Sequence, residues 1–205
     1  MGLSNYTELQ ASIADWLNRS DLTTVIPDLI TIAEAQLNRD VRHHKMLVRA
    51  TAQFDSQYSA VPADFVEASR IFITDTVSVI EQTTVSDIVK RRAETNNATG
   101  TPTYYTLVGQ QFEVYPTPDS VKNVELLYYS EIPALSSSTA TNWLLTMSPD
   151  AYLYATLLSA TPYLNNDERL ETWGALYASA ISNINQTSVA SRFAGANLRL
   201  KIRSY

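Results

Sequence analysis

The sequence predicts an α+β fold, because helical and strand-like hydrophobic patterns occupy separate parts of the chain. Apolar residues recur every three or four positions at both ends, whereas the middle third partly alternates and is rich in strand-forming residues. We expect an antiparallel helical bundle built from N- and C-terminal helix pairs, an inserted β-sandwich-like domain and an extended C-terminal tail. The expected boundaries are 1–44 and 136–190 for the bundle, 45–135 for the β domain and 191–205 for the tail.

Capping residues and apolar stripes predict the first two helices. Asn5 and Glu8 fit a capping pair, and the helix that follows them should end near Asn18. Pro27 suits the first position of a second helix, which the apolar spacing extends to about Arg42. These two helices form the first half of the expected bundle.

The middle of the chain predicts a series of strands and one short helix. Gly109 lies between two strand-like runs and indicates the turn of a hairpin. Residues 85–93 are expected to form the helix, and a loop rich in Asn, Thr, Gly and Pro follows at 94–102. The expected strands are 46–54, 58–61, 67–73, 77–80, 104–108, 112–115 and 124–129.

Two further helices are predicted after the polar loop at 136–141. Ser148, Pro149 and Asp150 supply an N-cap, a first-turn proline and a first-turn acid, and the helix at 151–158 is apolar on nearly every side. Such a helix is expected to be buried. Pro162 should end or kink it, and Asp167 is expected to cap the last helix. The apolar stripe of that last helix comprises Leu170, Trp173, Tyr177, Ala180, Ile181 and Ile184.

The composition of the 205-residue chain narrows the possible chemistry. It contains no cysteine, which excludes disulfides, thiolate metal sites and a cysteine nucleophile, and its five glycines form no phosphate-binding motif. The formal charge of −6 makes it a poor candidate for holding nucleic acid electrostatically. We therefore expect a non-enzymatic protein with no cofactor and no metal. Without a signal-peptide pattern or a membrane-spanning apolar run, we expect it to be made in a cytoplasm and to bind no membrane.

Two basic or imidazole-containing groups are interpreted structurally. His43 and His44 are adjacent, so on a helix they point to different faces and cannot by themselves chelate one metal. We expect both to be solvated or to cap the second helix. Lys90, Arg91 and Arg92 could contact a phosphate or a partner, but we expect them to form the solvated face of a short helix.

Acidic and tyrosine clusters are interpreted in the same way. Asp167, Glu168 and Glu171 lie at the start of a helix, where acids stabilise the helix dipole, although a pair of catalytic carboxylates is the alternative. Tyr128 and Tyr129 could stack on bases, but packing in a core or an interface is the better account in an acidic chain.

The C-terminal segment has the most distinctive pattern. The chain carries no acid and four bases after Glu171, so the segment is opposite in charge to the rest. Residues 198–203 alternate strictly, which would place three aliphatic side chains on one face of a strand and three basic ones on the other. Such a strand could add to a sheet edge of a partner, which we favour, or pair with the chain's own β domain.

Several stretches together resemble the head-to-tail adaptor, or connector, proteins of tailed bacteriophages. They are the N-terminal run Tyr6-x-Glu-Leu-Gln-x-x-Ile-Ala-Asp-Trp-Leu-Asn-Arg19, the hairpin region Gly100-x-Pro102-x-x-Tyr105 with Phe112-Glu-Val-Tyr-Pro-Thr-Pro118, and the C-terminal motifs Asn142-Trp-Leu-Leu-x-x-x-Pro149-Asp-x-Tyr-Leu-Tyr154, Pro162-Tyr-Leu-x-Asn-Asp-x-Arg169 and Trp173-x-x-x-Tyr177. The resemblance covers nearly the whole chain. These motifs are structural, so their specificity lies in their number and order.

The resemblance implies a structural virion protein of the head-to-tail neck. It implies a homo-oligomeric ring, usually dodecameric, that binds the portal protein, meets the tail or nozzle proteins and surrounds the DNA exit channel without reading its sequence. It also implies that the C-terminal extension docks on the portal. Carried over by position, that role falls on Arg192, Leu198, Arg199, Leu200, Lys201, Ile202, Arg203 and Tyr205.

Two other functions compete with this one. A tail-completion protein, acting as a stopper or tail-tube terminator, would share the composition and differ in what its two ends touch. A small hydrolase would need a cleft with convergent carboxylates, and the acids near Asp167 and Glu171 are the candidates for it.

Overall fold

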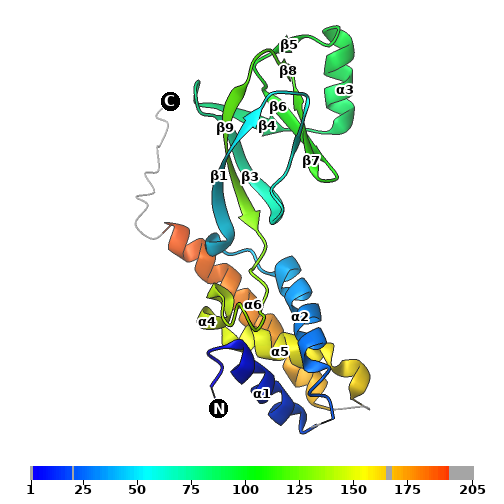
Figure 1. Ribbon diagram of the computed structural model, residues 1–205, viewed down its shortest axis with the longest axis vertical. Coiled ribbons are helices and arrows are strands. Elements are labelled where there is room, and N and C mark those ends of the chain that lie inside the picture. The colour runs from blue at the N-terminus through cyan, green and yellow to red at the C-terminus, as the bar shows by residue number, and fades with distance from the viewer. Residues whose placement is uncertain (1, 20, 165–167, 194–205) are drawn as a thin grey trace, which may run out of the picture. The chain divides into compact units, whose positions relative to one another are not determined.

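The computed structural model describes residues 2–19, 21–164 and 168–193, and the chain divides into two compact units (Figure 1). The helical unit comprises residues 1–45 and 132–205, and the β unit comprises residues 46–131. The fold is mixed α+β, with N-terminal helices, a curled seven-stranded sheet and C-terminal helices. This order confirms the predicted fold class at that level.

The helical unit begins with two helices whose boundaries follow the capping residues. The Asn5 side chain accepts a hydrogen bond from the Glu8 N–H at 3.0 Å, and Asn18 adopts a left-handed conformation at the other end. Glu8 accepts bonds from the backbone and hydroxyl of Ser4 rather than completing a reciprocal box with Asn5. The helices of this unit are α1 (Tyr6–Leu17), α2 (Ile26–Asp40), α4 (Trp143–Met147), α5 (Pro149–Ser159) and α6 (Arg169–Phe193), with 3₁₀ turns η1 (His44–Met46) and η2 (Thr161–Tyr163).

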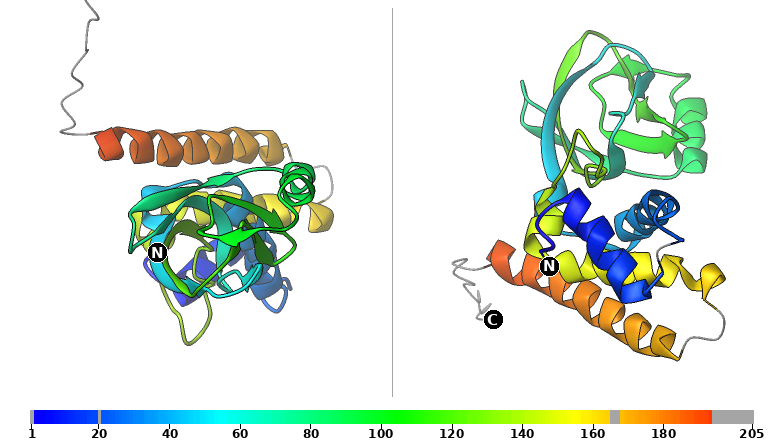
Figure 2. Two further views of the ribbon diagram at one scale, coloured as in Figure 1. Left: turned by 90° about the horizontal axis from the view of Figure 1, so that it is seen from above. Right: turned by 60° about the horizontal axis from the view of Figure 1, so that its bottom comes forward.

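Helix α5 is the centre of the helical unit. It contacts α1, α2, α4 and α6, and it lies between the N-terminal helices and α6 in the right view of Figure 2. Ala151, Tyr152, Ala155 and Leu157 are fully buried, as its all-round apolar sequence predicts. Ser148 occupies the N-cap position, with Pro149 and Asp150 in the first turn, as predicted. Its side chain makes no capping bond, however, and the nearest side-chain cap belongs to Asn142 at the start of α4.

A buried polar network joins α2, α5 and the chain that returns from the β unit. Glu34 on α2 accepts hydrogen bonds from the Leu135 N–H at 2.7 Å and from the Tyr152 hydroxyl at 3.4 Å. The Asn142 amide donates to that hydroxyl at 2.6 Å and to the Pro133 carbonyl at 2.7 Å. Burial raises the pKa of Glu34 and of Tyr152. Each polar group in this network has a partner, which is what a buried network requires.

The β unit consists of one large sheet and a small two-stranded pair. The spatial order of the large sheet is β1-β9-β3-β4-β6-β7-β2, and β5 pairs with β8. Among the described residues, β1 and β2 are therefore its two edges. The elements are β1 (Leu47–Phe54), β2 (Tyr58–Ala60), β3 (Phe65–Ile73), β4 (Ser78–Gln82), α3 (Val85–Glu94), β5 (Thr99–Gly100), β6 (Tyr104–Val108), β7 (Gln111–Tyr115), β8 (Thr117–Pro118) and β9 (Lys122–Ser130).

The expected sandwich-like domain is corrected to one curled half-barrel sheet. A sandwich requires two sheets packed face to face. Here β9 pairs with β1 and β3 along its length, and a short parallel contact between β4 and β6 continues the same sheet. Register shifts near Phe65 and Arg70 interrupt the β3–β9 ladder, and such bulges increase the local twist of a sheet. The sheet consequently curls around its own core.

The core of the β unit is rich in aromatic side chains. The Phe65 ring packs edge-on against Phe112 with centroids 5.5 Å apart and stacks on Tyr128 at 5.7 Å. The Tyr128 hydroxyl donates to Asp64 at 2.8 Å, and burial together with that carboxylate raises the pKa of Tyr128 to about 12. Core packing was the predicted role of Tyr128, and it is confirmed.

Replacing Glu34 tests the polar network of the helical unit. We expect Glu34→Leu to lower the free energy of unfolding by about 3 kcal/mol, because two buried donors lose their acceptor. The near-isosteric Glu34→Gln keeps an acceptor oxygen and should cost less than about 1 kcal/mol. Urea unfolding followed by circular dichroism measures both values. Equal losses in the two variants would contradict the network as described.

Candidate functional site

Most of the predicted docking residues lie outside the described part of the chain. Only Arg192 falls within it, in the last turn of α6. The first three residues of the expected tail, 191–193, are helical. The remaining predicted residues, Leu198, Arg199, Leu200, Lys201, Ile202, Arg203 and Tyr205, lie outside the described residues. The described part of the chain therefore includes α6, the helix that precedes most of the predicted docking residues.

Helix α6 is attached to the rest of the helical unit at both ends of its buried stripe. Trp173 is buried, and the Tyr177 hydroxyl donates to Asp40 at the end of α2 at 2.6 Å. Burial and that carboxylate raise the pKa of Tyr177. These contacts confirm the predicted apolar stripe and fix the first half of α6 against α2.

The second half of α6 binds the backbone that follows α2. Asn185 accepts the Arg42 N–H at 2.8 Å and donates to the Asp40 carbonyl at 3.1 Å. Ser188 accepts the His44 N–H at 2.8 Å. Side chains from α6 thus satisfy backbone groups at the point where the chain leaves α2, and the helix preceding the tail is held there.

His43 is buried, which corrects its predicted solvated position. The residue is only 1% exposed, and its ring stacks on Trp143 with centroids 5.3 Å apart. The Lys45 N–H donates to Nδ1 at 3.2 Å, while Nε2 is buried without a hydrogen-bond partner. Burial lowers the pKa of His43, and the neighbouring His44 and Lys45 lower it further. Packing against Trp143 of α4 therefore buries this ring instead of leaving it in solvent.

The basic run on α3 is not simply a solvated face. Arg92 is nearly buried and donates to the Val114 carbonyl at 2.8 Å, to Thr117 at 3.0 Å and to Asn97 at 2.9 Å, and it pairs with Glu113 at 3.4 Å. Its fixed fork of donors joins α3 to β7 and β8. This residue therefore holds the helix on the sheet.

The other two basic residues of the run lie closer to solvent. The Arg91 guanidinium lies 4.1 Å from the centre of the Tyr104 ring and pairs with Asp87 at 2.8 Å. That pair lowers the pKa of Asp87. Lys90 is exposed and lies 3.8 Å from Glu94, so the predicted solvated face is confirmed for Lys90 alone.

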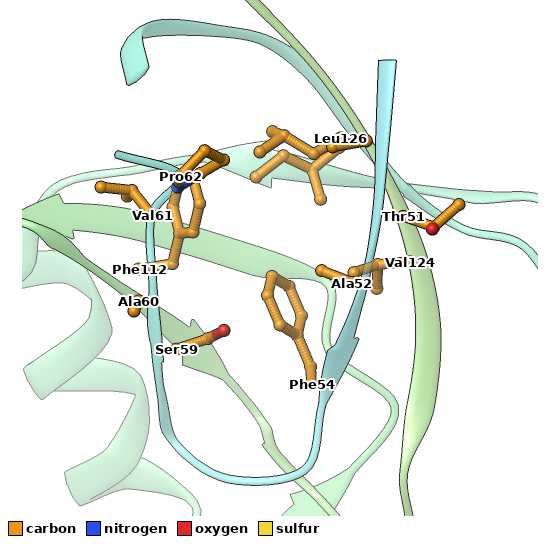
Figure 3. Close-up of a pocket in the computed structure, with 12 residues that line it drawn as sticks. Thr51, Ala52, Phe54, Ser59, Ala60, Val61, Pro62, Phe112, Val124 and Leu126 are labelled. Carbon is orange, nitrogen blue, oxygen red and sulfur yellow. The ribbon is translucent and has the colours of Figure 1, made fainter. Parts of the chain in front are cut away.

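An apolar cavity opens inside the β unit, between its two edge strands. It has a volume of about 250 Å³, and Phe54, Phe112 and Leu126 lie around it (Figure 3). Small residues keep it open on the two edges, with Ala52 on β1 and Ala60 on β2. No sequence pattern singled out this cavity.

In the described residues, the acids considered for a hydrolase site do not form a cluster with other candidate catalytic side chains. Glu168 and Glu171 are exposed, and Asp167 lies outside the described part. Within residues 2–19, 21–164 and 168–193, no group of three or more His, Asp or Glu side chains is placed to hold a metal ion. Across the same residues, every helix is too short or too polar to span a membrane.

Comparison with known proteins identifies one family. The family model described as the SU10 adaptor protein matches residues 4–199, which is nearly the whole chain. No curated protein matches the chain. The match includes both units and most of the tail segment, so it concerns the chain as a whole rather than one unit.

Arg92 gives a test of how α3 is held. We expect Arg92→Met to lower the free energy of unfolding by about 3 kcal/mol, because Glu113 would be left as a buried acid without its cation. Lys90→Met on the exposed side of the same helix is the matched control and should change it by less than about 0.5 kcal/mol. Urea unfolding monitored by circular dichroism measures both, and comparable losses would show that α3 is not anchored by Arg92.

His43 gives a test of pH dependence. The unfolded histidine gains a proton near pH 6.5, whereas the folded one resists protonation, so the free energy of unfolding should fall as the pH drops from 7 to 5. We expect wild type to lose about 1 kcal/mol more than His43→Asn over this range, since asparagine keeps an acceptor and does not titrate. Identical pH profiles for wild type and His43→Asn would contradict the buried neutral ring.

Proposed function

Because the chain belongs to the SU10 adaptor protein family, we propose that this phage adaptor is a structural virion protein joining the capsid portal to the tail. It does so as a ring of identical subunits, dodecameric as is usual for head-to-tail connectors, around the DNA exit channel. The match over residues 4–199 is the observation that carries the proposal. It is made in the bacterial host and works in the neck of the virion.

The negative charge of the protein supports a role in which it surrounds DNA without binding the phosphates tightly. A formal charge of −6 offers phosphates no net attraction, so DNA can slide through a lumen lined by such subunits. A closed ring also needs two unlike faces on every subunit. Exposed aliphatic residues suited to such faces occur on several elements, including Val85 and Val89 on α3 and Leu176 and Val189 on α6.

The C-terminal segment is the proposed portal-docking element. Its alternating aliphatic and basic residues from Leu198 to Arg203 fit addition of a strand to an edge on the portal, with Arg192 and Tyr205 flanking it. Helix α6 supports this role, because its contacts with Asp40 and the backbone of Arg42 fix the start of the segment. A tail attached to a held helix costs less freedom on docking than one attached to a loose helix.

Co-elution with the cognate portal protein tests the proposal. We expect the full chain to elute with the portal as one complex whose mass, by light scattering, corresponds to a stoichiometric ring. A version that ends at Phe193 keeps every described helix and strand and should lose most of this binding. Circular dichroism of the shortened version provides the control for folding.

The remaining outcomes of this experiment are equally informative. Binding by both versions would keep the adaptor role and reject the tail as its docking element. If the full chain does not bind, the portal is not its partner and the tail-completion function is favoured. The same co-elution experiment with tail proteins would then test that function.

A further inference from the structure

We propose that the apolar cavity of the β unit is a docking site for an extended segment of another protein, which inserts between β1 and β2 as an added strand of the half-barrel. The segment that fits this site carries aliphatic residues at alternate positions and basic residues between them. Every observation behind the proposal concerns the β unit alone, residues 46–131, so the inference does not rest on the proposed portal role.

The half-barrel leaves one side of each edge strand without a partner. In the described residues β1 pairs only with β9, and β2 pairs only with β7. The residues at the two ends of β2 also bond toward β7. The Val61 N–H donates to the Gln110 carbonyl at 3.1 Å, and the Gln57 carbonyl accepts from the Val114 N–H at 3.0 Å. A strand with one neighbour presents a row of backbone N–H and C=O groups on its other side. An incoming strand can bind both rows.

The connection between the two edge strands limits what can enter between them. Figure 3 shows β1 and the segment through β2 on opposite sides of the cavity, joined by residues 55–57 along a curved path. From Phe54 to Tyr58 this connection can span at most about 14 Å. One strand between two others needs about 10 Å, since neighbouring strands lie roughly 4.8 Å apart. Two added strands would need the connection fully stretched, so the site accepts one.

The inner face of β1 is exposed where the barrel is incomplete. Ala52 on β1 lies opposite Val124 on β9, and both line the cavity. Val124 is buried, whereas Ala52 is exposed. The cavity has a volume of about 250 Å³, and the buried rings of Phe54 and Phe112 lie beside it. Because an apolar cavity of about 150 Å³ accepts a benzene ring, more than one aliphatic side chain fits in this space.

The geometry requires an occupant that belongs to no sheet. Insertion between β1 and β2 uses the backbone groups on both sides of the incoming strand. Every strand in the described residues already has at least one partner, so such a strand from a second copy could complete only one of the two edges. An extended segment of another protein can bond to both. Its side chains alternate, so one face fills the cavity and the other faces water.

The charge of the β unit favours basic residues on the outward face of that segment. Residues 46–131 include eleven acidic and six basic side chains, which gives the unit a formal charge of −5. Arg49 on β1 already pairs with Glu125 at 3.0 Å, and Asp55 on the connection is exposed. Basic side chains therefore approach a complementary surface, whereas acidic ones would be repelled. The site thus selects an alternation of aliphatic and basic residues.

Calorimetric titration of a designed peptide into the full chain tests the proposal. The probe is Lys-Val-Arg-Val-Lys-Val-Arg, blocked at both ends. We expect it to bind at one site with a dissociation constant below about 1 mM. The peptide Lys-Arg-Val-Val-Val-Lys-Arg has the same composition and charge but no alternation, and it should bind at least about tenfold more weakly. Absence of binding by the probe, or equal binding of both peptides, would overturn the proposal.

Two variants of the full chain locate the binding site. Ala52→Trp fills the cavity from β1 and should weaken binding of the probe at least about tenfold. Gln53→Trp adds the same ring on the opposite face of β1 and is the matched control, expected to bind within about twofold of wild type. Circular dichroism checks that both variants fold. Equal binding by the two variants would place the probe elsewhere and reject the site.

Hydrogen exchange followed by mass spectrometry gives a readout that needs no variant. When the probe is added to the full chain, we expect the backbone amides of β1 and β2 to exchange more slowly, because their free N–H groups gain acceptors. Exchange in α3 should stay unchanged. Protection that spares both edge strands would reject strand insertion even if the probe binds.

A shortened chain separates the alternative occupants. The version that ends at Phe193 keeps every described helix and strand and should bind the probe within about twofold of the full chain. Binding that is at least about tenfold tighter would mean that this chain supplies its own occupant, within one molecule or between copies. That result would overturn the assignment of the site to another protein.

Discussion

The buried hydrogen bonds between Glu34, Tyr152 and Asn142 are the constraint on which the rest of the helical unit depends. The two halves of this unit are separated in the chain by the whole β unit, residues 46–131. Loop-closure entropy rises only slowly with length, so the long insertion is tolerated, but something must specify where the returning chain docks. Apolar packing is non-directional, whereas the Leu135 N–H and the Asn142 amide each need one particular acceptor. The network thereby sets the position at which α5 enters the centre of the unit.

The same logic recurs where other elements meet. Arg92 holds α3 through directed bonds to Val114 and Thr117, and Asn185 holds α6 through the backbone at Arg42. In each case apolar burial supplies most of the free energy, and a polar side chain selects one arrangement among several that would bury similar area. In the ring that we propose, an error in the position of one element would be repeated in every subunit, so directed bonds of this kind suit the proposed role.

The sequence predicts the helices and strands well because their signals are local. Asn5 caps α1, Pro27 lies in the first turn of α2, one position after its first residue, and Gly109 turns the β6–β7 hairpin with a φ of +60°, as their residue types indicate. The wrong predictions concern residues whose burial is determined by a partner distant in the sequence. Trp143 packs on His43 and buries it. Glu113 and Val114 bind the Arg92 guanidinium and so hold that residue against the sheet. The sequence around His43 and Arg92 gives no sign of these distant partners. Likewise, alternation along β9 shows that one face is buried but not that the same sheet curls round to cover it. The cavity has no local signal at all, since the residues that line it come from strands far apart in the chain, among them β1, β2, β7 and β9.

The distribution of one residue type between the units has a practical consequence. The three tryptophans, Trp16, Trp143 and Trp173, all belong to the helical unit, and Trp143 is stacked on the buried His43. The β unit contains tyrosine and phenylalanine but no tryptophan. Intrinsic tryptophan emission therefore reports on the helical unit alone, while the β unit is spectroscopically silent above the tyrosine band. The protein therefore carries an intrinsic fluorescent probe of the helical unit, and unfolding of that unit can be followed without attaching a dye.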